Sequence, residues 1–387
     1  MANNNNKDKC NVPHLRFPEF SGEWDYSTIG SEFDLYSGNT PSRLDKEQFN
    51  GDVNWISSGE LKEHYIYDSK EKITEEAASY NNLRLLPIGT FVIAIYGLEA
   101  EGVRGTGSII KKKSTISQAC MAFSSKGAII NEFLYSWYKK HGNLIGLKYA
   151  QGTKQQNLSY DIISQFRISY PSIKEQKKLE EFISLLDERI ATQNKIIEDL
   201  KKLKSAITDL LFHSIADAHT IRLGKIAHIT NGAGDVQDAN TEHQEDWYPF
   251  FDRSEELKWF PTYSFDKEAV IYAGEGQSFY PRYYNGKFAL HQRCYAITDF
   301  ASCIIPKYCY HFMNTLNSYF VRNSVGSTVP SLRMDIFQKV EIRLPPISKQ
   351  QHICKIIDAF YTKLEVEQRG ISILQELKQF LLSQMFI

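Results

Sequence analysis

The chain has 387 residues, of which 42% are hydrophobic and 24% charged, and its formal net charge is −1. This composition is typical of a soluble globular protein, and the length predicts two domains rather than one. The longest apolar runs, such as residues 91–95, are far shorter than the roughly 20 residues of a membrane span, and residues 1–11 do not resemble a secretory signal. We therefore expect a cytoplasmic protein without a membrane segment, and the charge gives no sign of a strongly basic nucleic-acid binder.

Taken in chain order, residues 1–11 open with an asparagine run and are expected to be disordered. Residues 12–170 mix glycine, aromatic and β-branched residues, and runs such as 91–95 before Gly97 predict strands and turns. Residues 171–213 predict one long helix. Residues 214–345 repeat the mixed pattern, with a strand over 269–272 before Gly274, and residues 346–387 predict a second long helix.

Both helices carry a heptad seam, in which seam positions alternate in steps of four and three residues. In the first helix the seam includes Leu179, Ile183, Leu186, Ile190, Gln193, Ile197 and Leu200. In the second it includes Ile353, Ile357, Phe360, Leu364, Glu367, Ile371 and Leu374. About 40 helical residues form a rod of roughly 60 Å, whose apolar stripe needs a partner helix.

The chain is two copies of one plan. A spacing of 174 residues relates Gln118 to Gln292 and Gly152 to Gly326, and near the start of each half the spacing becomes 194, as from Gly38 to Gly232. Two similar halves that pack about a pseudo-twofold axis require antiparallel helices. The predicted fold class is therefore α+β: two globular domains joined by two long antiparallel coiled-coil helices. Gln193 and Glu367 can then meet as a polar layer that fixes register, or lie at the seam edge with their heads in water.

Two related but non-identical domains on a stiff spacer form a ruler, and DNA offers binding sites about 34 Å apart along one face. We therefore expect recognition of a split and asymmetric DNA site. The alternatives are a coiled-coil adaptor that tethers two protein-binding domains, and a self-contained DNA-modifying enzyme.

Several segments resemble the specificity subunits of type I restriction-modification systems. They are residues 12–20 with 22–24, 37–41, 54–61, 73–76 and 86–90, followed in the second half by 326–332, 344–347 and 350–351. The resemblance covers essentially the whole chain. In two places the chain departs from the pattern: residues 248–253 stand where a Trp-Ile-Ser match is expected, and residues 152–158 replace a Val-Pro-Ser form.

The resemblance implies two target recognition domains, two spacer helices and double-stranded DNA as a partner. It also implies two modification subunits, which carry S-adenosylmethionine and methylate adenine, and a restriction or translocase subunit that can join them. The chain itself is expected to need no cofactor and to be non-catalytic. The sequence has no phosphate loop, no Asn-Pro-Pro-Tyr motif and no compelling nuclease carboxylate cluster.

In the first domain the densest basic cluster is Lys111, Lys112 and Lys113, close to Arg104, and it can neutralise phosphates. A polar loop carries side chains suited to phosphates or adenine edges: Lys154, Gln155, Gln156 and Asn157. The alternatives are a solvated turn for the lysines and an ordinary surface loop for residues 154–157.

The second domain interleaves aromatic and basic side chains at Arg282, Tyr283, Tyr284 and Lys287, so that arginine can read guanine while tyrosine packs on sugar or phosphate. The alternative is a hairpin whose tyrosines pack on the sheet. Arg253 and Arg333 are weaker candidates, because an isolated arginine is usually only a surface charge. The six cysteines form no C-x-x-C pair and predict neither a disulfide nor a metal site.

Overall fold

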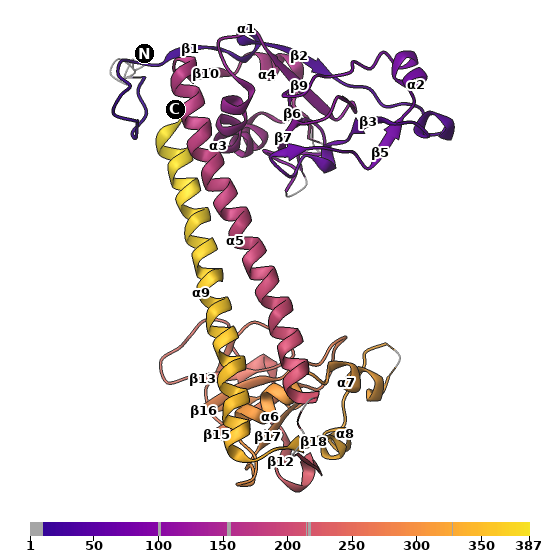
Figure 1. Cartoon of the computed structure of the whole chain (residues 1–387), viewed down its shortest axis with the longest axis vertical. Coiled ribbons are helices and arrows are strands. Elements are labelled where there is room, and N and C mark those ends of the chain that lie inside the picture. The colour runs from indigo at the N-terminus through magenta and orange to yellow at the C-terminus, as the bar shows by residue number, and fades with distance from the viewer. Residues whose placement is uncertain (1–10, 100–101, 153–155, 214, 216–217, 327) are drawn as a thin grey trace. The chain divides into compact units, whose positions relative to one another are not determined.

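The structure is a computed structural model that describes residues 11–99, 102–152, 156–213, 215, 218–326 and 328–387. It divides into two compact units (Figure 1), of which unit 1 contains residues 1–193 and 370–387 and unit 2 contains residues 194–369. The long helices α5 (Ile173–His213) and α9 (Ile347–Met385) are each divided between the two units, so that each unit contains one part of both helices.

Unit 1 is built on a five-stranded sheet. Its strand order is β2 (Phe33–Ser37), β9 (Cys120–Ser125), β6 (Phe91–Ala94), β7 (Gly107–Ile110) and β4 (Tyr65–Ile66). All neighbours are antiparallel except β7 and β4. A second sheet has the order β5 (Glu71–Ile73), β3 (Val53–Ile56) and β8 (Ser114–Ile116), and β1 (Asp25–Thr28) pairs with β10 (Arg167–Tyr170).

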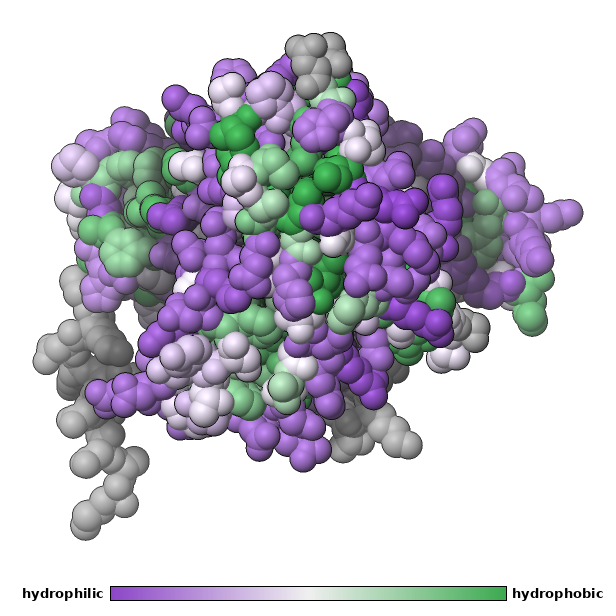
Figure 2. Space-filling model, turned by 90° about the horizontal axis from the view of Figure 1, so that it is seen from below, coloured by the Kyte–Doolittle hydropathy of each residue, from purple (hydrophilic) through white to green (hydrophobic). Residues whose placement is uncertain are grey.

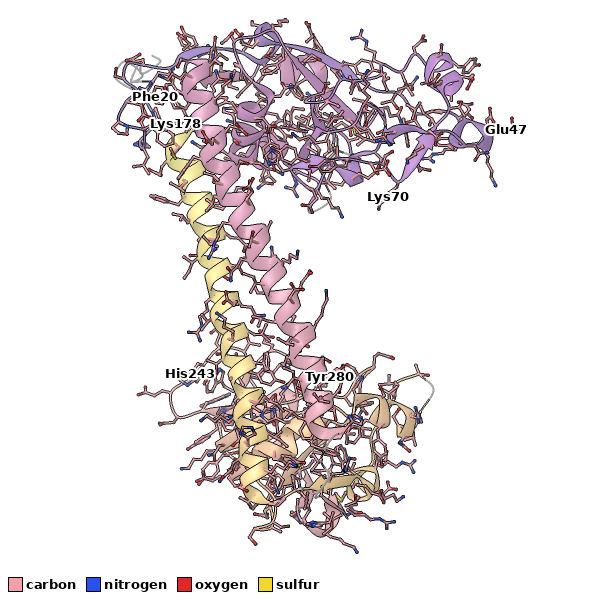
Figure 3. The ribbon with its side chains drawn as sticks, viewed as in Figure 1. Phe20, Glu47, Lys70, Lys178, His243 and Tyr280 are labelled. Atoms are coloured by element: carbon pink, nitrogen blue, oxygen red, sulfur yellow. The ribbon has the colours of Figure 1, made fainter. Side chains whose placement is uncertain are left out.

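The helical parts of unit 1 are α1 (Ile29–Glu32), α2 (Glu75–Tyr80), α3 (Asn131–Tyr149), α4 (Tyr160–Ser164) and the short η1 (Lys46–Phe49) and η2 (Ser58–Glu60). Every residue of β6 is buried, as expected for a continuous apolar run at the centre of a sheet. The first turns of α5 join the core, and there Lys178, labelled in Figure 3, pairs with Glu19 and lies over the ring of Phe17.

Unit 2 is built on a six-stranded sheet. Its strand order is β12 (His228–Asn231), β17 (Cys294–Thr298), β15 (Phe265–Ala273), β16 (Arg282–Leu290), β13 (Tyr248–Phe251) and β14 (Lys258–Phe260). β11 (His219–Arg222) pairs with β18 (Glu341–Leu344). The helical parts are α6 (Pro306–Met313), α7 (Asn317–Asn323), α8 (Met334–Lys339), η3 (Leu223–Lys225) and η4 (Val236–Asp238).

The two units share one topology, which confirms the predicted repeat. The order β2-β9-β6-β7 in unit 1 corresponds to β12-β17-β15-β16 in unit 2. Glycines at matching positions explain part of the likeness. A Cβ on Gly38 would lie 1.9 Å from the carbonyl oxygen of Ile116, and one on Gly232 would lie 2.0 Å from that of Leu290. Only glycine allows so close a backbone approach.

Residues 248–253 occupy the place of the Trp-Ile-Ser segment. β3 runs parallel to β8 with Trp55 opposite Thr115, and β13 runs parallel to β16 with Phe250 opposite Ala289. Ala289 follows Thr115 by the repeat spacing of 174 residues. The match was hard to see in the sequence because a strand requires only that the side chains be apolar, and Phe serves as well as Trp or Ile.

The helices are antiparallel within each unit. In unit 1 Leu179 and Ile183, near the start of α5, share a core with Leu382 and Met385, near the end of α9. In unit 2 the direction is reversed, and Phe212 at the end of α5 packs in one core with Ile353 and Ile357 at the start of α9. The predicted fold class, with antiparallel helices, is confirmed.

Each residue predicted for the seam is buried or half-buried in the structure. Gln193 is 4% exposed in unit 1, so its head does not lie in water. Glu367 is half-buried in unit 2 and pairs with Lys363. The polar layer that would join Gln193 to Glu367 stays a prediction.

Hydrophilic side chains surround smaller apolar areas on the face shown in Figure 2. No helix in the described ranges has the length and apolarity that a bilayer crossing requires. Among the described cysteines, Cys120, Cys294, Cys303, Cys309 and Cys354 are free thiols.

Candidate nucleic-acid interface

The two basic clusters predicted from the sequence lie at the same point of the repeated fold. Lys111–Lys113 form the connection between β7 and β8, whereas Lys287 lies in the middle of the long strand β16. Lys287 follows Lys113 by 174 residues, and both side chains are exposed. Each unit therefore presents an ammonium group from this position.

Two members of the first cluster already have partners. The Lys111 ammonium lies 3.9 Å from the centroid of the Tyr65 ring and 3.9 Å from a carboxylate oxygen of Glu132. Lys112 lies 3.9 Å from a carboxylate oxygen of Asp68, in a pair that is largely exposed and therefore weak. In the described part of the chain Lys113 has no such partner, which makes it the member best placed to meet a phosphate.

Arg104 lies against helix α3 rather than beside the lysines. A Cβ on Gly146 would lie 2.9 Å from its Cγ, so the stem of Arg104 packs where α3 has no side chain. Arg104 is half-buried, whereas Lys113 is exposed, so Arg104 is less accessible to a ligand than Lys113.

Only part of the predicted polar loop can be placed, because Lys154 and Gln155 lie outside the described residues. The backbone N–H of Gln156 donates to the Glu99 carboxylate at 2.8 Å. Asn157 exchanges two backbone hydrogen bonds with Gln151, and its side-chain oxygen is buried without a partner among the described residues. The loop is thus fastened to the domain at Gln156 and Asn157, and the Asn157 side-chain oxygen is withdrawn from solvent.

In β16 the interleaved aromatic and basic residues each contact a different partner. The Arg282 guanidinium donates to the backbone carbonyl of Ser254, and the Tyr283 hydroxyl donates to the Glu268 carboxylate. Tyr284 packs 5.3 Å from the Phe251 ring. These contacts match the alternative in which the tyrosines pack on the sheet.

Lys287 keeps an exposed charge but is not isolated. Its ammonium lies 4.7 Å from the centroid of the Tyr263 ring and 6.0 Å from that of Tyr248. A cation held over aromatic faces is oriented without being neutralised, so it can still attract a phosphate. Arg333, at the start of α8, is also exposed.

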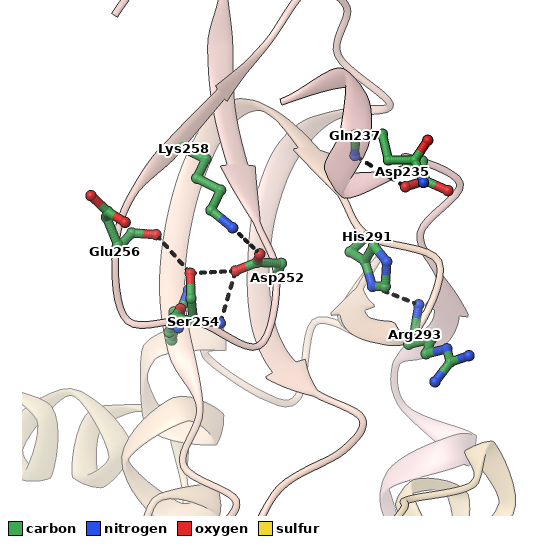
Figure 4. A network of polar contacts seen from close by, with 9 residues as sticks. Asp235, Gln237, Asp252, Ser254, Glu256, Lys258, His291 and Arg293 are labelled. Carbon is green, nitrogen blue, oxygen red and sulfur yellow. Dashed lines mark hydrogen bonds and ion pairs between the residues drawn. The ribbon is translucent and has the colours of Figure 1, made fainter. Parts of the chain in front are cut away.

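Arg253 lies at a pocket of about 540 Å³ in unit 2, at the ends of β13 and β15 and the β16–β17 turn. Asp252 also lines this pocket and organises the loop between β13 and β14 (Figure 4). One carboxylate oxygen accepts from the Ser254 backbone at 2.8 Å and hydroxyl at 2.7 Å, and the other accepts from Lys258 at 2.6 Å. Burial acts to raise the pKa of Asp252, but these hydrogen bonds together lower it below its ordinary value.

Sequence reasoning missed Gln292, which lines this pocket, and Gln118, which lies at the equivalent position of unit 1. They were used only as markers of the repeat, although both side chains are exposed on equivalent turns. The repeat spacing was the signal that could have found them, since the same polar residue at the tip of both turns is not required by the sheet. Among the described residues, no group of three or more His, Cys, Asp or Glu side chains is arranged to hold a metal ion.

The geometry defines a class of protein: two related α+β domains, each of which contains parts of two long helices and exposes a lysine at the same position of the repeat. The family described as type I restriction modification DNA specificity domain matches residues 21–202 and again residues 216–379. The chain therefore belongs to this family and carries its domain twice.

Characterised relatives agree. The type I restriction enzyme MjaIX specificity subunit of Methanocaldococcus jannaschii is 24% identical over 412 residues, which cover 94% of this chain and 92% of that protein. The EcoDI specificity subunit of Escherichia coli is 31% identical over 165 residues, 42% of this chain and 36% of that protein. The EcoR124I/EcoR124II specificity subunit of the same species is 29% identical over 192 residues, covering 49% and 46%.

Solved structures support the fold. The S subunit of the type I restriction-modification system from M. genitalium has a TM-score of 0.62 at 18% identity, and the match covers 97% of this chain and 99% of that one. A chain from a study of complex assembly and conformational transition of the type I R-M system has a TM-score of 0.63 at 15% identity, covering 97% and 99%. The comparisons match a DNA specificity subunit with two recognition domains, not the adaptor alternative.

Proposed function

We propose that this chain selects a split, asymmetric DNA site through its two recognition domains and leaves the chemistry to partner subunits. Two modification subunits would bind S-adenosylmethionine and methylate adenine, and a restriction subunit could join them. In this proposal α5 and α9 hold the two half-sites at one spacing.

The observation that carries the proposal is the pair of equivalent but different domains. Both present a lysine from the same position of the repeat, Lys113 in unit 1 and Lys287 in unit 2. Their surroundings differ, because Lys287 lies over two tyrosine rings and Lys113 follows two lysines that already have acidic partners. Similar phosphate contacts with different neighbours favour two half-sites of different sequence.

The spacer helices support the part of the proposal that concerns partners. Away from the seam they expose large apolar side chains, including Leu185, Leu203 and Leu210 on α5 and Ile373, Leu377 and Phe380 on α9. Leu377 follows Leu203 by the repeat spacing, so equivalent faces of the two helices carry the same apolar residue. Two equivalent faces suit two copies of one partner.

The test is reconstitution of this chain with the modification subunits that the proposal requires. Sequencing that detects methylated adenine should show one bipartite motif in DNA from cells that express the complex. The chain alone, incubated with DNA and labelled S-adenosylmethionine, should transfer no methyl groups. Methylation without sequence preference would contradict the proposal, as would transfer by the isolated chain.

A further inference from the structure

Each unit contains a tight turn that equivalent contacts hold from two sides. The turn lies between β8 and β9 in unit 1 and between β16 and β17 in unit 2. The N–H of Ser117 donates to the carbonyl of Ile56 at 2.9 Å, and the N–H of His291 donates to the carbonyl of Phe251 at 3.0 Å. These bonds tie each turn to the end of the neighbouring parallel strand.

The second contact comes from the strand on the other side. The Ser37 hydroxyl lies 3.3 Å from the backbone carbonyl oxygen of Cys120 and 3.5 Å from that of Gln118, and the Asn231 amide donates to the carbonyl of Gln292 at 3.4 Å. The glycine after each donor, Gly38 or Gly232, allows the backbones to approach where a side chain could not fit. The turns are therefore fixed in position from both sides.

The glutamine side chain at each turn takes no part in these contacts. Gln118 and Gln292 are both exposed, and within the described residues neither amide has a hydrogen-bond partner. A rigid turn that presents a free primary amide suits recognition, because the donor and acceptor are placed before a ligand arrives.

In unit 2 the amide lies at the pocket of about 540 Å³ that also contains Asp252, Arg253, Glu275 and Arg293. The charges there are mostly paired: Asp252 binds Lys258, and Glu275 binds Arg293 at 2.8 Å. Arg253 is the arginine of this pocket that has no carboxylate partner among the described residues. Arg253 can therefore meet a backbone phosphate beside the pocket, while the uncharged Gln292 amide suits the polar edge of a base.

We infer that Gln118 and Gln292 are specificity-determining residues, one in each recognition domain, and that each contacts an adenine in its half-site. A glutamine amide can donate to adenine N7 and accept from the adenine N6 amino group in the major groove. The inference rests on the proposed function and adds to it the residue and the base. The two domains would share this contact and differ at its neighbours, since Ala119 follows Gln118 where Arg293 follows Gln292.

The test compares the methylated motif of the complete wild-type complex with those of Gln118→Ala, Gln292→Ala and the control Gln379→Ala, which removes an exposed glutamine from α9. Gln292→Ala should reduce discrimination about 5- to 150-fold at one A·T position of one half-site. Gln118→Ala should do the same in the other half-site. In both variants the untouched half of the motif reports a folded complex, and Gln379→Ala should keep the whole motif.

If both turn variants keep the full wild-type motif, the inference is wrong while the proposed function stands. Relaxation at positions that are not A·T pairs overturns the adenine assignment. A wild-type complex that methylates without any motif overturns the proposed function itself, and the inference with it.

Discussion

Gln350 makes in unit 2 the same three side-chain hydrogen bonds that Gln176 makes in unit 1. Its carbonyl oxygen accepts from the N–H of Ile305 at 2.9 Å, and its amide donates to the carbonyls of Cys303 and Pro345 at 2.9 Å each. Gln176 likewise accepts from Ile130 at 2.9 Å and donates to Ala128 and Pro171 at 2.8 Å each. Each glutamine thereby ties the first turn of a spacer helix to the start of α3 or α6.

Gln176→Glu should destabilise unit 1. The substitution keeps the size of the side chain but removes both donors and places a carboxylate against the carbonyls of Ala128 and Pro171, at a side chain that is 0% exposed. We expect a loss of about 2–5 kcal/mol in the free energy of unfolding, measured by denaturant titration and hydrogen exchange. Gln379→Glu, an exposed change on α9, should shift it by less than about 0.5 kcal/mol. Equal free energies of unfolding for the two variants would show that the Gln176 hydrogen bonds do not stabilise unit 1.

Gly38→Ala and Gly232→Ala should each disturb one turn. A Cβ at either position would overlap a backbone carbonyl oxygen at about 2 Å, so the strand must shift. We expect about 1–3 kcal/mol of destabilisation in thermal unfolding. Gly59→Ala is the control, because nothing lies within 4 Å of a Cβ placed there. Alanine tolerated at both turns would show that the close approach is not maintained in solution.

Asp252→Asn should make stability less dependent on pH. Since the folded pKa of Asp252 lies below that of an unfolded aspartate, its contribution is fully present above about pH 4 and is lost as the pH falls through the folded value. Wild type should therefore exceed the variant by about 1–3 kcal/mol at pH 7, with the difference shrinking below pH 4. The exposed Asp266→Asn serves as control in the same urea titrations; a difference that stays constant with pH would contradict the assignment.

Leu179→Ala should cost more than Leu185→Ala, six residues further along the same helix. Leu179 is 2% exposed in the core of unit 1, whereas Leu185 is 59% exposed. Truncation of the buried leucine should lower the free energy of unfolding by about 2–5 kcal/mol, and truncation of the exposed one should leave the isolated chain nearly unchanged. If calorimetry gave equal shifts for both, the seam assigned to α5 would be incorrect.

The repeat, the two seams and the fold class could be predicted because they rest on local periodicity and on residue spacing. The apolar residues that recur at steps of three and four from Leu179 and from Ile353 predict one buried face on each helix. The same reasoning identified the place of Lys111–Lys113 and Lys287, which the fold brings to equivalent positions.

What the sequence could not predict is which polar side chains remain available. Lys111 is engaged by Glu132 and Tyr65, and Arg282 by the carbonyl of Ser254, and these partners lie 21 to 46 residues away in the chain. Pairing over such distances depends on strand order, which composition does not specify. For the same reason the free amides of Gln118 and Gln292 emerged only when the turns around them could be seen.

The most direct test replaces residues 12–170 with the first recognition domain of a specificity subunit that reads a different site, in complex with the modification subunits. Sequencing of methylated adenines should show a hybrid motif, in which one half-site changes to that of the donor and the other half-site stays as in the wild type. A motif that is unchanged, or one in which both halves change together, would contradict the claim that each domain reads its own part of the DNA.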